Sequence, residues 1–554
     1  MKHLAITAIT LALIMLSCGP IEQEARIRGT VVGADGSVPP LAHVHLLKLG
    51  NNISATIMSV KVGDDGSFVL DLPDDGYYDM LVTAVNHRSV RIPLVSDDVI
   101  DLSDVRVKPA PYQYIDPMEE VRIIGDWNRF SRREAEPMTL QDDGTFVYER
   151  QVEGDTLTYQ LLGVETSGRS INGTDSDYYI YDGGGDYLSI VSVKGNMARV
   201  TFDLNKARIH TSEDLPDVSF GDEGHPVAEV WQVQKQWLAE AHRRDLAFSD
   251  YMNKHTTYEG FEYDLSDIKN RLLAAMSGDT GPEARRYAAV KLASLWEMGL
   301  ILEEDIFTAI ERMLPVTDPM WGAEPIGFLE IFRQIEGPEN MVRVFDDNLD
   351  KITDKRVKGA VLLEIGLGAK AAGDTGRQRE IYDDLMDDYV EITHPYISYR
   401  IMNELNPNLR IAGGKSVPEF ELSLLDNKQV VSRESMLGKY YLIDFWATWC
   451  GPCVGEMPNL HSAYDRFTGD NFEIISISFD QSVEDITEFR ADKWKMPWLH
   501  AYMEGGFAAD MAREFEVTGI PKPVLVDPEG TIVAAGPELR GERLEETLAQ
   551  HLEK

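Results

Sequence analysis

Cysteine is scarce in this chain of 554 residues, in which only Cys18, Cys450 and Cys453 occur. Three cysteines do not supply the disulfide framework that holds small exported domains together. A zinc site is also disfavoured, because no second C-x-x-C and no closely spaced pair of histidines stands near Cys450 and Cys453. The pair is therefore predicted to be catalytic, and no metal or cofactor is expected.

Positive charge is also in short supply: Lys and Arg total 53 against 93 Asp and Glu, which gives a formal net charge of −40. Nucleic acid is excluded as a partner, since phosphate binding needs a basic face. We interpret the acidity as a source of solubility. Hydrophobic residues make up 43% of the chain, which is typical of globular domains. One core rarely exceeds roughly 250–300 residues, so several domains are expected.

Long apolar runs are missing except at residues 4–16, which precede Ser17 and Cys18. This run suits a secretory signal but is shorter than the about 20 residues that span a bilayer. Ser17 and Cys18 resemble a bacterial lipobox. The resemblance implies a signal peptide at 1–17, lipidation of Cys18, a tether at 18–25 and a lipid-anchored, extracytoplasmic location in the cell envelope, facing the periplasm. The alternative is an ordinary cleaved signal with an incidental cysteine.

Residues 26–110 alternate short β-rich runs with turns, as in IRGTVVGADG and DDGSFVLDLPDDGYYD. Asp-Gly and Gly-rich turns between such runs indicate an antiparallel sandwich. The order of these segments resembles the carboxypeptidase regulatory-like β-sandwich. The resemblance implies a spacer or scaffold without chemistry of its own.

Residues 111–212 contain VRIIGDWNRF, a D-D-G-T-F strand and LTYQLLGVE. They resemble the Ig-like E-set modules that bind glycogen, in which exposed tryptophans stack on sugars. Trp127 matches the first of these platforms and no second one is evident, so carbohydrate is a weakly supported partner. The alternative is that Trp127 packs the sandwich.

Residues 213–411 change to helical periodicity, as in VAEVWQVQKQWLAEAHRRDLAF, where apolar residues recur every three or four positions. Pro and Gly divide this range into several helices. We predict an all-α array without chemistry and with a partner-docking role at most.

Residues 412–554 contain a buried strand, YYLIDFWAT, that leads directly into the helical pattern CGPCVGEMPNLHSAYDRF. W-C-G-P-C after a strand, with Thr518-Gly-Ile-Pro521 farther along, resembles the active site and cis-proline loop of thioredoxins. The range is similar to the TlpA/ResA type of thiol–disulfide oxidoreductase. The predicted fold class is therefore multidomain, with two N-terminal β-sandwich modules, a central all-α module and a C-terminal α/β thioredoxin fold.

Cys450 follows the buried strand and begins the helix. Helix N-termini carry unpaired N–H groups and partial positive charge, which favour a thiolate, so the pKa of Cys450 should lie below the usual value of about 8.5. The thiolate is the attacking species in disulfide exchange. Cys453, one turn later on the same face, is placed to close a Cys450–Cys453 redox disulfide.

Asp444 lies in the buried strand YYLIDFWAT, six residues before Cys450. Burial should raise the pKa of its carboxyl and let it accept a proton. The resemblance implies that Asp444 is the base for Cys453 and that Glu456 modulates the pair. The alternatives are a structural buried acid at Asp444 and a solvated helix residue at Glu456.

The resemblance also implies a cis peptide at Ile520–Pro521, whose loop turns its backbone toward the cysteines. These two residues, with Trp449, Gly451 and Pro452, are expected to bind an extended substrate segment by strand addition.

Lys522 stands where the family usually has Thr, and its charge would favour acidic substrates.

The leading hypothesis is an extracytoplasmic thiol–disulfide oxidoreductase that exchanges disulfides with protein thiols, as a reductant recharged by a membrane-linked electron donor. Two alternatives stay open. A thiol peroxidase is disfavoured because its T-x-x-C motif is absent, Thr448 standing two residues before Cys450. The other is a binding or scaffold lipoprotein with an accessory redox domain.

Overall fold

A computed structural model describes residues 25–553 except 34–35, 52, 74–75, 116–117, 133, 167–168, 184–185, 204–205, 207–214, 255–259, 470 and 542. The predicted signal peptide and Cys18 lie outside the described residues. The chain divides into two compact units. The first contains the residues up to Ala239 with Leu265–Val361 and Ile392–His394, and the second contains Glu240–Asp264, Leu362–Glu391 and Pro395–Lys554.

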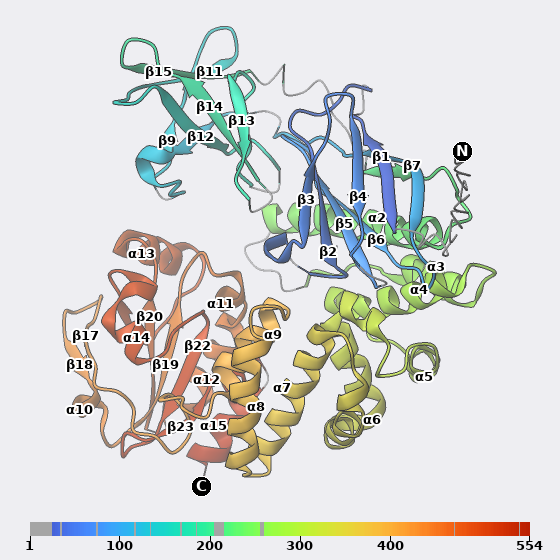
Figure 1. The fold of residues 1–554 in the computed structure, drawn as a ribbon. Coiled ribbons are helices and arrows are strands. Elements are labelled where there is room, and N and C mark those ends of the chain that lie inside the picture. Colours follow the sequence, from blue (N-terminus) through green and yellow to red (C-terminus); the bar gives the residue numbers. More distant parts are fainter. Residues whose placement is uncertain are drawn as a thin grey trace, which may run out of the picture. The chain divides into compact units, whose positions relative to one another are not determined.

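Two sheets at the start of the first unit share one hydrophobic core (Figure 1). Their strand orders are β16-β7-β1-β4 and β3-β2-β5-β6. The strands are β1 Arg26–Val31, β2 His43–Lys48, β3 Met58–Lys61, β4 Ser67–Asp71, β5 Tyr78–Thr83, β6 Val90–Leu94, β7 Asp101–Lys108 and β16 Asp217–Ser219. The range 213–411 was predicted to be helical throughout, and this is wrong at its start, where the strand β16 pairs antiparallel with β7.

Two further sheets, β10-β11-β15 and β13-β14-β12-β8-β9, share a second core. Their strands are β8 Arg122–Gly125, β9 Glu136–Pro137, β10 Thr139–Leu140, β11 Thr145–Gln151, β12 Thr156–Leu162, β13 Tyr178–Tyr181, β14 Tyr187–Ser192 and β15 Met197–Asp203. Strands with alternating buried and exposed residues, such as β15, fit a sheet with one face on a core. The resemblance of these sheets to particular sandwich families stays a prediction.

Trp127 lies in the short helix η2, Asp126–Asn128, directly after β8. Its indole Nε1 donates to Oε1 of Glu136 at 2.8 Å, and its ring stacks on Tyr148 with centroids 5.6 Å apart. The guanidinium of Arg150 lies 5.1 Å from the ring centroid. These contacts favour the interpretation that Trp127 packs its own module.

A helical region follows, as predicted. Its helices are α2 Pro226–Lys254, α3 Ser266–Ser277, α4 Pro282–Ser294, α5 Glu304–Met313, α6 Pro325–Asn348, α7 Lys355–Ala371, α8 Thr375–Asp388 and α9 Pro395–Arg400, with η4 Leu295–Met298, η5 Pro319–Ala323, η6 Leu349–Lys351 and η7 Ile401–Leu405. Within the described part of the chain, we find no helix whose length and apolar character would allow it to cross a membrane. Gly337 and Pro338 interrupt α6, since Gly337 adopts a positive φ of 71°.

The second unit contains the five-stranded sheet β21-β20-β19-β22-β23 (Figure 1). The strands after residue 411 are β17 Glu421–Ser423, β18 Val430–Ser432, β19 Tyr440–Trp446, β20 Phe472–Ser478, β21 Leu499–Tyr502, β22 Lys522–Val526 and β23 Ile532–Ala535, of which β17 and β18 form a separate two-stranded sheet. The helices after residue 411 are α10 Arg433–Met436, α11 Gly451–Gly455, α12 Met457–Phe467, α13 Val483–Asp492, α14 Asp510–Glu514 and α15 Arg543–Leu552, with η8 Gly506–Ala508 and η9 Gly536–Leu539.

The central strand β19 is buried on both faces, as its apolar run predicts. It is parallel to β20 and antiparallel to β22. Phe445 contacts Phe515, which follows α14, and Trp446 contacts Phe489 of α13. Because neighbouring side chains of a strand point to opposite faces, these contacts show that helices cover both sides of the sheet.

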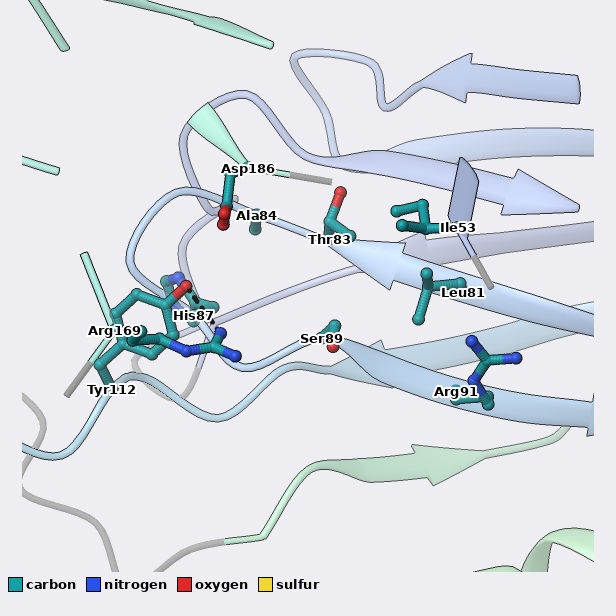
Figure 2. Close-up of a pocket in the computed structure, with 10 residues that line it drawn as sticks. All are labelled: Ile53, Leu81, Thr83, Ala84, His87, Ser89, Arg91, Tyr112, Arg169 and Asp186. Atoms are coloured by element: carbon teal, nitrogen blue, oxygen red, sulfur yellow. Dashed lines mark hydrogen bonds between the residues drawn. The ribbon is translucent and has the colours of Figure 1, made fainter. Parts of the chain in front are cut away.

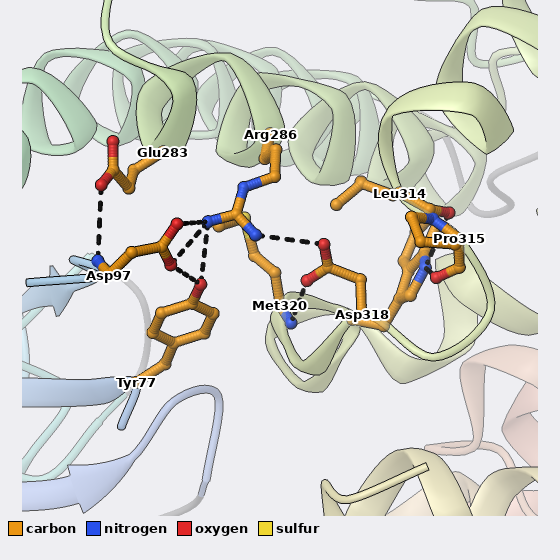
Figure 3. Close-up of polar contacts among 9 residues, drawn as sticks. Tyr77, Asp97, Glu283, Arg286, Leu314, Pro315, Asp318 and Met320 are labelled. Carbon is orange, nitrogen blue, oxygen red and sulfur yellow. Dashed lines mark hydrogen bonds and ion pairs between the residues drawn. The ribbon is translucent and has the colours of Figure 1, made fainter. Parts of the chain in front are cut away.

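Arg286 of α4 joins separate parts of the first unit through its guanidinium (Figure 3). Nη2 donates to both carboxylate oxygens of Asp97 and to the hydroxyl of Tyr77, each at 2.9 Å. Nη1 donates to Oδ2 of Asp318 at 3.2 Å, and Oδ1 of Asp318 accepts from the N–H of Met320. One side chain thus holds the loops on either side of β5 and β6 to α4 and η5.

We expect Arg286→Met to destabilise the protein, because it leaves the largely buried Asp318 without its cation. Removing one partner of such a pair should cost on the order of 3 kcal/mol. Urea unfolding of the full chain measures the change. Arg285→Met is the control, since the neighbouring Arg285 has no ion pair among the described residues. Equal stability of the two variants would contradict the role given to Arg286.

Candidate active site

Cys450 is the N-cap residue of α11, and Cys453 lies in the first turn of that helix. The two sulfurs form a disulfide. The N–H of Cys453 points to Sγ of Cys450 at 3.2 Å. Both residues are nearly buried, with 5% and 1% of their surface exposed. The strand, the short loop and the helix therefore place the pair at the carboxyl end of β19, as predicted.

The peptide bond Ile520–Pro521 is cis. The carbonyl oxygen of Ile520 lies 3.7 Å from Sγ of Cys450, so a loop from just before β22 lies directly against the cysteine pair. Trp449 is 57% exposed, and Gly451 and Pro452 are exposed beside it. All five residues expected to bind substrate thus lie at or next to Cys450.

Asp444 is buried in the middle of β19, and burial raises the pKa of its carboxyl to about 7. Ser476 of β20 donates to Oδ2 of Asp444 at 3.4 Å. Ser476 in turn accepts a hydrogen bond from Nε1 of Trp498 at 2.9 Å. The carboxyl therefore sits in a dry environment with few donors, where it can take up a proton near neutral pH.

Glu456 lies at the junction of α11 and α12, where the helix breaks two residues before Pro458. Its Oε2 accepts from the N–H of Gly541 at 2.8 Å, and its Oε1 pairs with Nε of Arg540 at 3.4 Å. The negative charge of Glu456 raises the pKa of Asp444, whereas Arg540 lowers it. The interpretation of Glu456 as a solvated helix residue is therefore wrong.

Lys522 does not present its charge to a substrate. It is 8% exposed, and its Nζ donates to the carbonyl oxygen of Glu516 at 2.8 Å. Burial lowers the pKa of its ammonium group. The expectation that Lys522 favours acidic substrates is wrong, because β22 turns this side chain into the interior.

Asp480 is a residue of the site that the sequence analysis missed. Its buried carboxylate accepts from the N–H of Thr448 at 3.0 and 3.1 Å and from the hydroxyl of Thr448 at 2.7 Å. Ser478 donates to its Oδ2 at 2.6 Å. Asp480 therefore fixes the loop that leads to Cys450. The signal in the sequence was that Asp480 ends the buried run FEIISISFD, because carboxyl ends of neighbouring parallel strands meet at one edge of a sheet.

The cis-proline loop also contacts the helices that precede the thioredoxin range. The hydroxyl of Thr518 donates to Oδ1 of Asn403 in η7 at 3.1 Å. A Cβ atom on Gly519 would lie 3.8 Å from the ring of Tyr399. The predicted boundary at residue 411 therefore separates segments that lie in one compact unit.

Metal-binding geometry is not found: the described residues contain no group of three or more His, Cys, Asp or Glu side chains placed to hold an ion.

Asp444→Asn should stabilise the oxidised protein above pH 7 by on the order of 3 kcal/mol and change its stability little at pH 4. The native carboxyl, with its pKa raised to about 7, keeps a proton that the unfolded chain loses near pH 4. Wild-type stability therefore falls between about pH 4 and pH 7, and the neutral amide removes that fall. Urea unfolding across this pH range measures it.

The control for this variant is Asp465→Asn, which removes a charge from the exposed side of α12. A stabilisation by Asp444→Asn that does not depend on pH would contradict the burial argument.

Asp480→Asn should loosen the Thr448 loop, because the amide nitrogen of asparagine cannot accept a hydrogen bond. Hydrogen bonds to a charged group contribute about 1.5–3 kcal/mol, so the N–H of Thr448 should exchange with solvent at least about tenfold faster. Amide exchange followed by mass spectrometry measures this, with the exposed Asp492→Asn as control. Unchanged exchange at Thr448 would show that Asp480 does not hold the loop.

The family model described as Thioredoxin-like matches residues 438–532. Thiol-disulfide oxidoreductase ResA of Bacillus thuringiensis subsp. konkukian (strain 97-27) is 28% identical over 141 residues, which cover 26% of this chain and 77% of ResA. Probable nucleoredoxin 1 of Arabidopsis thaliana is 33% identical over 120 residues, or 21% of this chain and 20% of that protein.

Among solved structures, the thioredoxin domain of a thiol-disulfide oxidoreductase from Bacteroides vulgatus is 33% identical, with a TM-score of 0.24. The match covers 26% of this chain and 98% of that one. A thiol:disulfide interchange protein from Bacteroides sp. is 32% identical over 26% of this chain and 93% of its own, with a TM-score of 0.25. By its sequence matches and its cysteine pair, the C-terminal part of this chain contains a thioredoxin-like domain whose homologues are thiol–disulfide oxidoreductases.

Proposed function

We propose that this oxidoreductase is a lipid-anchored protein of the cell envelope that exchanges disulfides with protein thiols outside the cytoplasm, as a reductant. The observation that carries the exchange is the Cys450–Cys453 disulfide at a helix N-terminus, with the carbonyl oxygen of Ile520 lying 3.7 Å from Cys450 Sγ. The apolar run at residues 4–16 and Cys18 support the location.

In the reducing direction, the thiolate of Cys450 attacks a substrate disulfide. A bond forms between Cys450 and one substrate sulfur, and the other substrate sulfur leaves as a thiolate. Cys453 then loses its proton to Asp444 and attacks Sγ of Cys450. The Cys450–Cys453 disulfide closes, the second substrate sulfur leaves, and two electrons have passed to the substrate. A membrane-linked donor would return these electrons.

The surface around Cys450 can accept an extended peptide. Trp449 offers an exposed indole, and the cis-proline loop brings its backbone to the sulfur. A substrate strand can pair with that backbone, which orders the scissile disulfide by main-chain hydrogen bonds rather than by side-chain identity. Broad acceptance of protein substrates follows from this geometry.

We further propose that the ranges 26–110, 111–212 and 213–411 act as spacer and docking modules for the redox domain at 412–554. The division into structured sheets and helices ahead of the cysteine pair supports this arrangement. The packing of Trp127 on Tyr148 argues against a role in stacking sugars.

The decisive experiment is a Cys453→Ala trap in the full chain. Without the resolving thiol, mixed disulfides between Cys450 and substrate proteins should accumulate on non-reducing gels and disappear with reductant. The double variant Cys450→Ala/Cys453→Ala is the matched control. A trap that captures no more than the control, while wild type consumes peroxide, would favour a thiol peroxidase instead.

The direction of exchange follows from equilibrating the wild type with glutathione. A reduction potential below roughly −240 mV supports a reductant, whereas a value near −120 mV marks an oxidant.

A further inference from the structure

A cavity of about 460 Å³ lies in the first unit, away in sequence from the cysteine pair. Its walls come from the end of β2, the approach to β5, η5 and the start of α7. The polar residues that line it include Lys48, Asn51, Asp354, Lys355 and Arg356. The redox mechanism uses none of these residues.

The described residues that line this cavity include three cations, Lys48, Lys355 and Arg356, and one carboxylate, Asp354, in a protein of formal net charge −40. Lys48 already has a partner, because its Nζ donates to the hydroxyl of Tyr78 at 2.9 Å. Asp354 is already engaged: its Oδ1 accepts from the N–H groups of Arg356 and Val357 at 2.9 and 3.1 Å. A local excess of positive charge with low-dielectric walls concentrates anions.

Arg356 is the strongest single sign of a ligand. It is 5% exposed, and its Nη2 lies 3.3 Å from Oδ2 of Asp354. Its Nη1 is buried and has no hydrogen-bond partner among the described residues. A buried cationic donor without an acceptor is costly, so the guanidinium has donor capacity that a carboxylate or phosphate in the cavity can use.

The other residues that line the cavity indicate which further groups the ligand carries. Oδ1 of Asn51 is also buried without a partner among the described residues, so it can accept from a hydroxyl or amine. The ring of Tyr77 lines the cavity, and its hydroxyl is held by Asp97 and Arg286 (Figure 3). Pro319 and Ile392 add apolar surface. A rigid aromatic and apolar wall suits an organic body.

A second cavity of about 280 Å³ in the same unit makes a useful contrast (Figure 2). Its arginines already have partners: Arg91 pairs with Asp79 at 2.6 Å, and Arg169 donates to the hydroxyl of Tyr112 at 3.3 Å. Asp186 lies in the same lining. The arginines of the smaller cavity therefore have hydrogen-bond partners, whereas Nη1 of Arg356 in the larger cavity has none among the described residues.

We propose that the larger cavity binds a small organic oxyanion, a carboxylate or phosphomonoester that carries an apolar body. The guanidinium of Arg356 and the ammonium group of Lys355 bind the oxyanion, and Tyr77 packs against the body. The proposal does not depend on the redox chemistry.

Isothermal titration of the full chain with phenyl phosphate, benzoate and inorganic phosphate tests the site. Phenyl phosphate or benzoate should bind, and whichever binds more tightly identifies the oxyanion. Inorganic phosphate should bind more weakly, because it cannot use the apolar wall. Absence of binding by both aromatic anions, or equal affinity for inorganic phosphate, would overturn the proposal.

Lys355→Gln should weaken the aromatic anion at least about fivefold, as expected for the loss of one ion pair. Lys351→Gln is the matched control, because Lys351 carries the same charge at the end of η6, four residues before Lys355, and is not among the residues that line the cavity. Arg356→Lys keeps the charge and removes the bidentate fork, so it should weaken binding while urea unfolding shows a folded protein. An equal loss of affinity in Lys351→Gln would show that the effect comes from the overall charge of the protein, and it would contradict the proposed site.

Discussion

The site depends first on the burial of β19. Helices cover both faces of this strand, and the loop after Trp446 leaves the sheet at its carboxyl end and leads directly into α11. The turn brings the first N–H groups of a helix to Cys450. Asp444, two residues before the strand ends, is held where water does not reach. The position of Cys450 at a helix N-terminus and the raised pKa of Asp444 thus have one structural origin.

Burial alone would make Asp444 a static neutral acid, and the surrounding charges tune it. Glu456 disfavours the ionised carboxylate, and Arg540 favours it. The same two residues form an ion pair, and Glu456 also binds the N–H of Gly541 ahead of α15. The junction between α11 and α12 is therefore tied to the segment before the C-terminal helix by Glu456, the residue whose charge raises the pKa of Asp444. A movement of α15 would change both the position of that junction and the pKa of Asp444.

The parts of the site that could be predicted from the sequence are those formed by residues that follow one another along the chain. An apolar run with a single carboxyl, followed by W-C-G-P-C and a helical pattern, specifies the strand, the loop and the helix by local rules. Contacts across long sequence distances were not predictable in this way. Thr448 and Asp480 are 32 residues apart, and Glu456 and Gly541 are 85 apart. Lys522 shows the same limit, because only the register of β22 against β19 decides that its side chain points inward.

Acidity has different consequences at the scale of the chain and at the scale of a cavity. At physiological salt, charges farther apart than about 8 Å are largely screened, so a small ion inside a pocket responds mainly to the nearest side chains. Around the larger cavity of the first unit the described charged side chains are Lys48, Asp354, Lys355 and Arg356. A polyanion such as nucleic acid must instead lie along an extended surface, where 93 acidic residues outnumber 53 basic ones. The charge distribution therefore disfavours an extended polyanion and is compatible with a small anion in the cavity.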